Sequence, residues 1–438
     1  MDRSNYDNTA RLKTLSITLP EYKQINKGIF GFLLFFTPLI FVTNTNELFE
    51  FPKTIFLYIV GTTLIWLFML KVIIEKKLPK LGSIWALIFV LTYLLSTMFS
   101  THVYTSVWGY YTRFNGGLVS VIILYGIYIV AINTLTKADK LKLTETILFS
   151  SVPVSIYAIT QHFSFIAILW ETNETTRVFS TFGQPNWLAA YLAMQLLISL
   201  YFVLIDSTKK STLWIAIALL NFSALWFTYS ISGIIGLLIG TTITAALNIN
   251  KVIKGYKKIL AILIICSFIS ITNPGIFSSK INDIYTELRK LSYVESVYAQ
   301  SEYEISDTGS IRKALWQGTL DLITSSSKNV LIGTGPETFP YEFQKFRPTQ
   351  LNYSSEWNFI FNKPHNYYLE LWSNLGIFGL TSYLFFINRV FKKPNKMLTG
   401  PLVAFFVTNI FGWPTVATAL IFWFYLSFWE PLNLEKHT

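Results

Sequence analysis

Residues 54–74 read TIFLYIVGTTLIWLFMLKVII, an apolar stretch in which Lys71 is the only charged residue. Because an α-helix rises about 1.5 Å per residue, this stretch is long enough to cross the roughly 30 Å hydrocarbon core of a bilayer. Comparable stretches recur along the whole chain. They predict an all-α integral membrane protein.

The composition favours the same class. Hydrophobic residues make up 52% of the chain and charged residues only 13%, with a mean hydropathy of +0.45, whereas a soluble domain carries about 25% charged residues. The net charge of +11 lies in short basic clusters between apolar runs, where it orients the chain and contacts anionic headgroups. We therefore expect membrane lipids, and no nucleic acid, among the partners. The single cysteine, Cys266, lies in an apolar run and indicates neither disulfide nor redox chemistry.

Twelve apolar runs are predicted to cross the membrane. They lie near Ile29–Thr43, Thr54–Ile74, Leu81–Phe99, Leu118–Leu135, Ile147–Trp170, Trp187–Ile205, Leu213–Tyr229, Ile234–Leu247, Ile259–Ile271, Tyr367–Ile387, Leu402–Ile410 and Val416–Trp429. Only residues 229–233 separate the seventh run from the eighth, and the eleventh is short.

The distribution of Lys and Arg predicts the orientation. The alternate loops that include the N-terminus hold 23 of these residues, and the short loops of the other set hold only Lys53, Arg113 and Arg177. The positive-inside rule then places both termini in the cytoplasm, and the N-terminus lacks the cleavage site of a signal peptide. The predicted order is a cytoplasmic tail, nine spans, an extracytoplasmic domain, three spans and a second tail: residues 1–28, 29–272, 273–365, 366–430 and 431–438.

The long segment between the ninth and tenth runs, residues 273–364, breaks the short-loop pattern. It carries nine basic and ten acidic residues, so it is nearly neutral. An unstructured loop of this length is unusual. Apolar residues recur within it at roughly helical spacing: Ile311, Leu315, Leu320 and Ile323. We expect a mostly helical external domain.

Few ionisable residues are predicted on the outer face, so each calls for an explanation. Arg113 lies in WGYYTRFNGG, residues 108–117. It is either an interfacial residue that snorkels among aromatic side chains or an anion site that faces the bundle interior. In the second case Gly116 and Gly117 form a hinge before the next helix.

A second group of polar residues lies in RVFSTFGQPN, residues 177–186. Its last three residues are typical of a turn that leads into a helix N-cap, which would explain Asn186 without any function. Arg177 and Gln184 are candidates for polar contacts to a ligand.

A third group is GSIRKALW, residues 309–316, where Ser310 is the expected N-cap and Arg312 falls in the first helical turn. Free backbone N–H groups and the helix dipole would join the guanidinium there in binding a phosphate. The alternative is a solvated arginine.

A fourth group is His365 with Asn366, where the long loop enters the tenth span. A helix N-terminus disfavours imidazolium, so His365 should be neutral and able to accept a proton. The alternative is a capping or interfacial histidine. His162, within the fifth run, is expected to be a packed or interhelical polar contact.

Two patterns are absent from the sequence. No Asp-x-Asp pair or His/Cys set of metal-ligand spacing is found in the outer loops, and no Walker loop is found anywhere. Glu302, Glu304 and Asp307 could bind a cation, but a solvated acidic stretch is the simpler explanation. We expect no metal, no cofactor and no nucleotide.

The segment from Arg312 to Gly379 resembles the O-antigen ligase and polymerase superfamily of bacterial inner-membrane proteins. The spacing of His365, Asn366, Gly376 and Gly379 matches the ligase-type histidine motif. Further similarities are Arg312 with Leu315 and Trp316, and the segments 333–339, 108–117 and 183–186. The resemblance implies a GT-C-like fold of about twelve transmembrane helices, with its large loop between the ninth and tenth.

One departure from the family pattern concerns the start of the eighth span. The family usually has Ser-Arg-Gly there, with an arginine that contacts pyrophosphate, and this chain has Ser232 where that arginine would fall. The departure leaves open the choice among a ligase, a polymerase and a protein O-oligosaccharyltransferase.

The resemblance implies transfer of a glycan from undecaprenyl pyrophosphate to an acceptor hydroxyl on the outer face of the cytoplasmic membrane. His365 would deprotonate the acceptor, whose attack opposite the leaving group inverts the anomeric carbon, and arginines would neutralise the pyrophosphate in place of a metal. The partners would be a lipid-linked oligosaccharide donor and a glycan, lipid or protein acceptor. The implied substrate-binding residues are Arg312, Arg113, Arg177, Gln184, Asn186 and Asn366.

A secondary transporter for a sugar or small anion is the alternative of another class. A transporter would place ionisable residues or broken helices near the midplane. The predicted spans hold almost no charged residue, and the polar features gather at the outer face. This distribution favours an enzyme.

Overall fold

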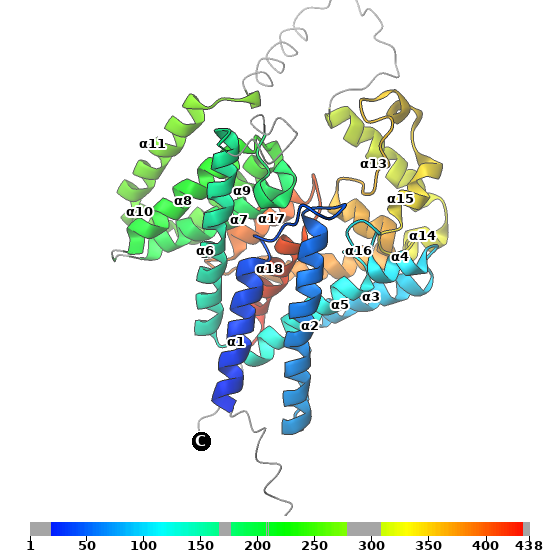
Figure 1. The fold of residues 1–438 in the computed structure, drawn as a ribbon, viewed down its shortest axis with the longest axis horizontal. Coiled ribbons are helices and arrows are strands. Elements are labelled where there is room, and N and C mark those ends of the chain that lie inside the picture. Colours follow the sequence, from blue (N-terminus) through cyan, green and yellow to red (C-terminus); the bar gives the residue numbers. More distant parts are fainter. Residues whose placement is uncertain (1–18, 166–176, 207, 209, 278–307, 432–438) are drawn as a thin grey trace, which may run out of the picture.

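The structure is a computed structural model that describes residues 19–165, 177–206, 208, 210–277 and 308–431. These residues form helices and no strand, which confirms the all-α prediction for the described part of the chain (Figure 1). The α-helices are α1 (Leu19–Phe36), α2 (Glu50–Glu75), α3 (Ile84–Met98), α4 (Val103–Trp108), α5 (Leu118–Thr134), α6 (Lys137–His162), α7 (Pro185–Ile205), α8 (Lys210–Phe227), α9 (Ile231–Leu247), α10 (Ile249–Lys254), α11 (Tyr256–Thr272), α13 (Thr308–Thr324), α14 (Ser327–Leu331), α15 (Phe339–Glu342), α16 (Tyr367–Lys392), α17 (Thr399–Thr408) and α18 (Val416–Leu426). Short 3-10 helices are η4 (Ser180–Phe182), η5 (Phe343–Phe346), η6 (Thr349–Tyr353) and η7 (Ser427–Trp429).

The first helix differs from its predicted span at both ends. Helix α1 begins at Leu19, within the predicted tail of residues 1–28, and ends at Phe36 instead of Thr43. Tertiary contacts explain the earlier start, because Asn26 is buried and its Nδ2 donates to Thr134 Oγ1 at 2.6 Å. The last residues of the predicted fifth span, 166–170, lie outside the described residues.

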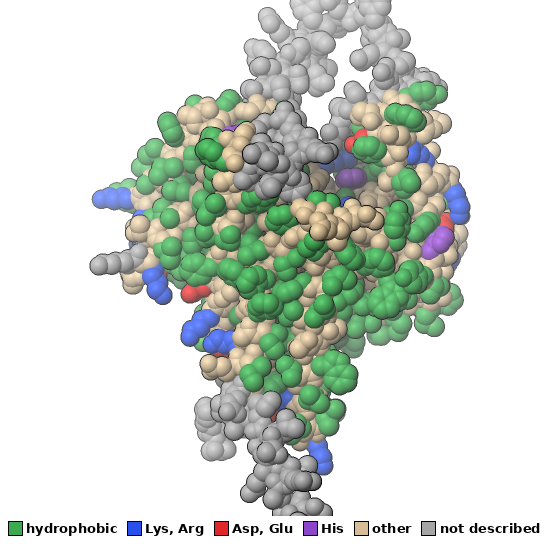
Figure 2. Space-filling model, in the orientation of Figure 1, with side chains coloured by type: hydrophobic (Ala, Val, Ile, Leu, Met, Phe, Trp, Pro, Cys, Tyr) green, Lys and Arg blue, Asp and Glu red, His purple; other side chains and the backbone are tan. Residues whose placement is uncertain are grey.

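Among the described residues, four helices are long and apolar enough to cross a membrane: α2, α6, α7 and α8. Much of α2 faces outward, with Ile59, Trp66 and Ile74 exposed by 62%, 68% and 77%. Figure 2 shows hydrophobic side chains over the middle of the visible face, with Lys and Arg toward its edges. So much exposed apolar surface indicates a membrane-embedded protein. The number of twelve spans and their orientation stay predictions.

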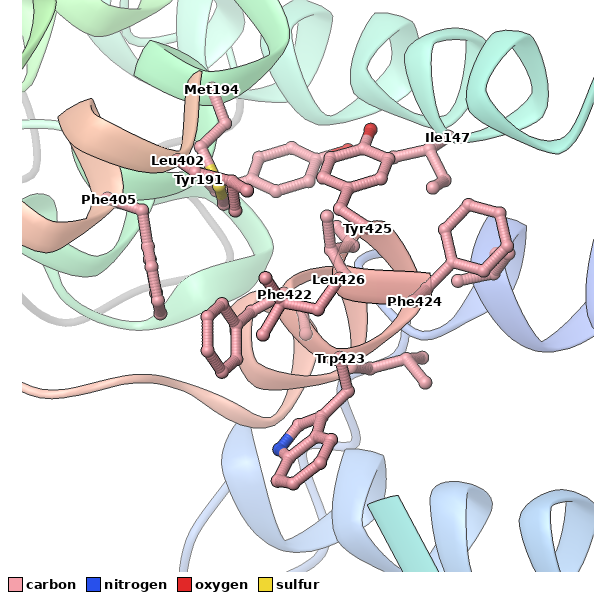
Figure 3. Close-up of a cluster of buried hydrophobic side chains, with 14 of the residues drawn as sticks. Ile147, Tyr191, Met194, Leu402, Phe405, Phe422, Trp423, Phe424, Tyr425 and Leu426 are labelled. Carbon is pink, nitrogen blue, oxygen red and sulfur yellow. The ribbon is translucent and has the colours of Figure 1, made fainter. Parts of the chain in front are cut away.

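Helix α18 lies inside the bundle and carries apolar side chains on all sides, as expected of a helix without a solvent face. Tyr425 and Phe424 are fully buried and point in different directions from it (Figure 3). The helix begins with a capping box between Thr415 and Thr418. This fixed start positions the loop before it, which carries Trp413.

Residues 308–361 contain a second, smaller hydrophobic core, built on α13 and the short helices that follow. Ile311, Leu315 and Phe343 are buried in it, and the first two belong to the helical pattern of the sequence. Leu320, which also belongs to that pattern, is 43% exposed. Its neighbour Thr319 is fully buried instead and bonds back to Leu315 O at 2.7 Å.

Helix α16 is kinked at Gly376, whose φ of +68° is strained for a residue with a side chain. A Cβ at this position would lie 2.2 Å from the Leu331 carbonyl group, so only glycine allows the loop after α14 to approach. Thr334 N and Gly335 N then donate to the carbonyls of Ser373 and Asn374, at 2.9 and 3.0 Å. The kink therefore attaches the smaller core to α16, next to the loop that holds His365.

Candidate active site

His365 lies in the loop between the smaller core and α16, with its backbone in the left-handed region at φ +54°. Trp316 holds this loop in place, because its indole N–H donates to Pro364 O at 3.0 Å. Trp316 is one helical turn after Arg312 on α13, so the two side chains lie on the same face of the helix. This contact brings Arg312 and His365, which are far apart in the sequence, to one region.

A small pocket joins His365 to the start of α7. It is lined by His365, Gln184, Asn186, Trp187 and Trp413, among others. The Trp413 ring meets the His365 ring edge to face, with centroids 5.0 Å apart. Three of the predicted site residues thus share one pocket, and the sequence analysis missed the tryptophan between them.

The start of α7 corrects one prediction. Gln184, not Asn186, is the N-cap, and its Oε1 accepts a hydrogen bond from Trp187 N at 3.2 Å. Pro185 then takes the first helical position, where its missing N–H is no loss. The side chain of Asn186 is free of capping and instead accepts hydrogen bonds from Arg177 Nη2 (3.1 Å) and Ser230 Oγ (2.8 Å).

Arg177 is anchored by neutral oxygen atoms. Besides Asn186, its Nε donates to the carbonyl of Thr228 at 3.0 Å. Ser232, which stands where the family has arginine, lies beside this network, with its Oγ 3.1 Å from Ser230 Oγ. The structure therefore brings a guanidinium from residue 177 close to the position where the family's arginine would begin.

Arg113 lies on the other side of the pocket. Its guanidinium is 5.1 Å from the Trp187 ring and 6.0 Å from the Trp413 ring, and its Nε has no hydrogen-bond partner among the described residues. This position between two indole rings favours an arginine that faces the bundle interior, and an anion site at Arg113 stays a prediction.

The N-cap prediction on α13 is wrong, because Ser310 lies within the helix and not before it. The helix terminus therefore does not assist Arg312 as expected. Burial lowers the pKa of Arg312, and Glu356 partly offsets this effect. In the described part of the chain, none of Arg113, Arg177 and Arg312 forms an ion pair with a carboxylate.

The electrostatics keep His365 neutral. Burial, together with the positive charges of Arg312 and Arg113, lowers the pKa of His365 to about 4. Burial and the charge of Arg312 also lower the pKa of Arg177. A neutral imidazole can accept a proton. Guanidinium groups that form no ion pair among the described residues could bind an anion beside it, and that anion would favour the protonated imidazole.

Asn366 has a capping role. It is the N-cap of α16, and its Oδ1 accepts hydrogen bonds from Tyr368 N (3.0 Å) and Leu369 N (3.2 Å). These bonds occupy its side-chain oxygen, so the structure gives no support to a direct contact with substrate. Its place in the histidine motif is explained by the helix start that it fixes.

Three further charged residues near His365 were missed by the sequence analysis. Lys363 is buried and pairs with both Glu337, at 2.5 Å, and Glu370. Burial opposes its charge, but the two carboxylates outweigh this effect and raise the pKa of Lys363. Glu370 lies in the predicted tenth span, where a carboxylate is costly without a partner, and this was a signal that could have been used.

The described residues contain no group of three His, Cys, Asp or Glu side chains that could hold a metal. The acidic residues Glu302, Glu304 and Asp307 lie outside the described residues. The prediction of metal independence therefore stays a prediction.

Comparison with known families bears on this arrangement. Residues 216–384 match the model of the O-antigen ligase family. This match supports membership of the O-antigen ligase superfamily. The matched part includes Ser232, Arg312 and His365, whereas Arg113 and the start of α7 precede it.

Membership of the O-antigen ligase superfamily implies a membrane enzyme of the glycosyltransferase kind, with a lipid-linked glycan and an acceptor as partners. No match was found among curated proteins or among solved structures. The structure adds to the family match the residues that surround His365 and lie outside the matched segment: Arg113, Arg177, Gln184 and Asn186.

Proposed function

We propose that the protein transfers a glycan from undecaprenyl pyrophosphate to an acceptor hydroxyl on the outer face of the cytoplasmic membrane. The observation that carries this proposal is the place of His365, in one pocket with Gln184 and Asn186 and near arginines that form no ion pair with any carboxylate of the described residues. A pocket of this kind suits the dianionic pyrophosphate of the donor, which gains a further negative charge as it leaves, and a hydroxyl that must lose its proton.

In the proposed reaction His365 accepts the proton of the acceptor hydroxyl. The acceptor oxygen forms a bond to the anomeric carbon, while the bond from that carbon to the pyrophosphate oxygen breaks and its electron pair leaves with the undecaprenyl pyrophosphate. Arg177 and Arg312 would stabilise the charge that develops on the leaving group. Attack opposite the leaving group inverts the configuration at the anomeric carbon.

Burial is the first cause of the low pKa of His365, and the charges of Arg312 and Arg113 lower it further. A bound pyrophosphate would offset the charges of the arginines. The pKa of His365 would then rise toward the working pH, where a general base is most effective. Donor binding would thus prepare the base for the second substrate.

The proposed reaction needs no metal, since guanidinium groups take the part that a divalent cation would otherwise play. Transfer by the purified protein should therefore survive EDTA. Loss of transfer on chelation, restored by magnesium or manganese, would contradict the arginine-based account.

A deletion strain tests the function. We expect the strain to accumulate a glycan linked to undecaprenyl pyrophosphate and to lose the same glycan from its final acceptor. The His365→Ala gene should fail to restore either pool, whereas His102→Ala, at an exposed histidine that stacks on Tyr341, should restore both. Unchanged pools in the deletion strain would refute the proposal. The acceptor that loses the glycan separates the alternatives: lipid A core for a ligase, another repeat unit for a polymerase, a protein for an oligosaccharyltransferase.

Cysteine labelling tests which side the site faces. In a Cys266→Ala background, Ser326→Cys should react with an impermeant maleimide added from outside, and Lys137→Cys should not. Both positions are exposed in the structure, so accessibility within the fold does not bias the comparison. Labelling of residue 137 and not residue 326 would invert the predicted orientation.

A further inference from the structure

A second cavity lies beside the His365 pocket, between α2, α3, α5, α16 and α18. Its volume is about 90 Å³, which is room for several water molecules or for the hydroxyl-bearing edge of a larger ligand. Its polar wall includes Asn115, Ser120, Glu337, Lys363 and Glu370. We call it the Glu370 cavity.

The ion-pair cluster in the polar wall of the Glu370 cavity has one carboxylate more than it has ammonium groups, and the positive charge of Arg113 acts on Glu370 from beside the cavity. One ammonium group, from Lys363, contacts two carboxylates, from Glu337 and Glu370, and all three side chains are buried. Glu370 Oε1 pairs with the lysine, but its Oε2 has no hydrogen-bond partner among the described residues. A buried carboxylate oxygen without a donor is costly, so this atom indicates that a hydrogen-bond donor normally binds there.

The rest of the cavity is apolar and aromatic, with Phe89, Leu124, Phe422 and Trp423 among its lining. A few hydrogen-bonding groups facing aromatic and aliphatic walls are typical of a small-molecule site. A further negative charge is disfavoured next to the two carboxylates. The walls therefore suit a group that offers O–H or N–H donors and carries no negative charge.

Trp413 separates the Glu370 cavity from the His365 pocket and lines both. Its ring is 5.0 Å from the His365 ring and 5.8 Å from the Lys363 ammonium. The two spaces thus differ in charge across one indole ring. On the side of Arg177 the arginines form no ion pair among the described residues, and on the side of Glu370 two carboxylates share one ammonium group.

We propose that the Glu370 cavity binds the acceptor, by a sugar edge that presents hydroxyl or amino groups and no phosphate. This inference rests on the proposed function, since it divides the two substrates of the transfer between the two sides of Trp413. The anionic donor takes the arginine side, and the neutral or cationic acceptor takes the carboxylate side. An acceptor phosphorylated at that edge would be rejected.

The test uses three sugars that differ in charge: methyl 2-amino-2-deoxy-β-D-glucoside, methyl β-D-glucoside and glucose 6-phosphate. Each is titrated by ligand-observed NMR against the full-length protein in lipid nanodiscs. We expect the first two to bind at least about tenfold more tightly than the phosphate. Glu370→Gln should lower the affinity for the amino sugar by about tenfold or more, as expected for loss of a hydrogen bond to a charged group.

Two variants control for unfolding and for charge in general. Ala419→Leu would fill the cavity from α18 without changing any charged group, and it should abolish binding of all three sugars. Glu342→Gln removes a carboxylate that pairs with Lys345 outside the cavity, and it should leave the affinities for all three sugars unchanged. Absence of saturable binding at millimolar sugar, equal binding of the phosphate, or binding unaffected by both Glu370→Gln and Ala419→Leu would overturn the inference.

A separate measurement distinguishes this inference from the proposed function. Binding of undecaprenyl pyrophosphate to the same nanodiscs should be unchanged in Glu370→Gln and Ala419→Leu. If the lipid binds and the sugars do not, the inference fails and the proposed function stands. If the lipid does not bind to the wild type, the proposed function fails, whatever the sugars do.

Discussion

The positively charged side chains near the two ends of α18 differ in whether a carboxylate pairs with them. At its C-terminal end, Arg389 pairs with Glu430 and donates to Leu426 O at 2.7 Å, while Lys140 donates to Ser427 O at 2.7 Å. Cations at the end of a helix satisfy its last carbonyls and interact favourably with its dipole.

At the N-terminal end of α18, no carboxylate of the described residues pairs with the nearby guanidinium groups. Arg113 lies 6.0 Å from the Trp413 ring, and the described partners of Arg177 are an amide and a carbonyl oxygen. Burying a cation without a counter-charge is costly. The protein supplies the counter-charge at one end and leaves it to a ligand at the other, which is why we assign the anion site to the His365 end.

The largest effect is expected from His365→Ala. Loss of a general base should lower turnover by about 10²–10⁴-fold, while the affinity for undecaprenyl pyrophosphate stays nearly unchanged. Single-turnover transfer and lipid binding, measured on the same preparation, separate the two quantities. A folded variant that binds the donor and transfers it at the wild-type rate would remove His365 from the reaction.

Glu430→Gln tests the ion pair at the C-terminal end of α18. It leaves the Arg389 guanidinium without its carboxylate, so the folded state should lose up to about 3–5 kcal/mol, the usual cost of breaking a buried pair. The thermal midpoint should fall, and the transfer rate per folded molecule should not. A lower rate at unchanged midpoint would mean that this end also contributes to the reaction.

Arg312→Ala tests the anion site itself. Loss of charge-assisted hydrogen bonds to pyrophosphate should weaken donor binding by roughly 10–100-fold and slow transfer as well. Arg312→Lys should restore only part of the affinity, because a point charge lacks the bidentate geometry. Lys313→Ala, at an exposed position next to it, is the matched control and should leave donor affinity unchanged.

The smallest effect on stability is expected from Arg113→Met. Removing an unpaired, partly buried cation relieves a desolvation cost and forfeits its contact with the Trp187 ring, so the net change should be within about 1 kcal/mol. Donor binding should nevertheless weaken. A large loss of thermal stability would show that Arg113 is paired as firmly as Arg389, and this would contradict the difference between the two ends of α18.

The sequence predicted the local features well, because hydrophobic runs and helix starts are encoded by neighbouring residues. The apolar runs and the polar group around His365 follow from such signals. The N-cap at Asn186 was misplaced by two residues, since Gln184 also caps a helix and Pro185 suits the first turn. Which of several neighbouring polar residues caps a helix depends on the local backbone geometry, which a sequence motif alone does not determine.

Long-range pairings could not be predicted in the same way. Trp413 reaches His365 only because α18 is buried at the centre of the bundle, and Glu337 meets Lys363 across 26 residues. Neither contact leaves a periodic signal in the sequence. Glu370 was missed, although its need for a partner was predictable, because a carboxylate in an apolar run is costly without a partner in any fold.

The most direct test of the account is the pKa of His365, measured by NMR on the selectively labelled protein with and without undecaprenyl pyrophosphate. Without the lipid, the imidazole should be neutral at neutral pH and should gain its proton only as the pH falls toward about 4. The bound anion should offset the charges of the arginines, favour the protonated form and raise the pKa. A pKa that stays the same or falls further when the lipid binds would contradict the claim that these arginines hold the pyrophosphate beside His365.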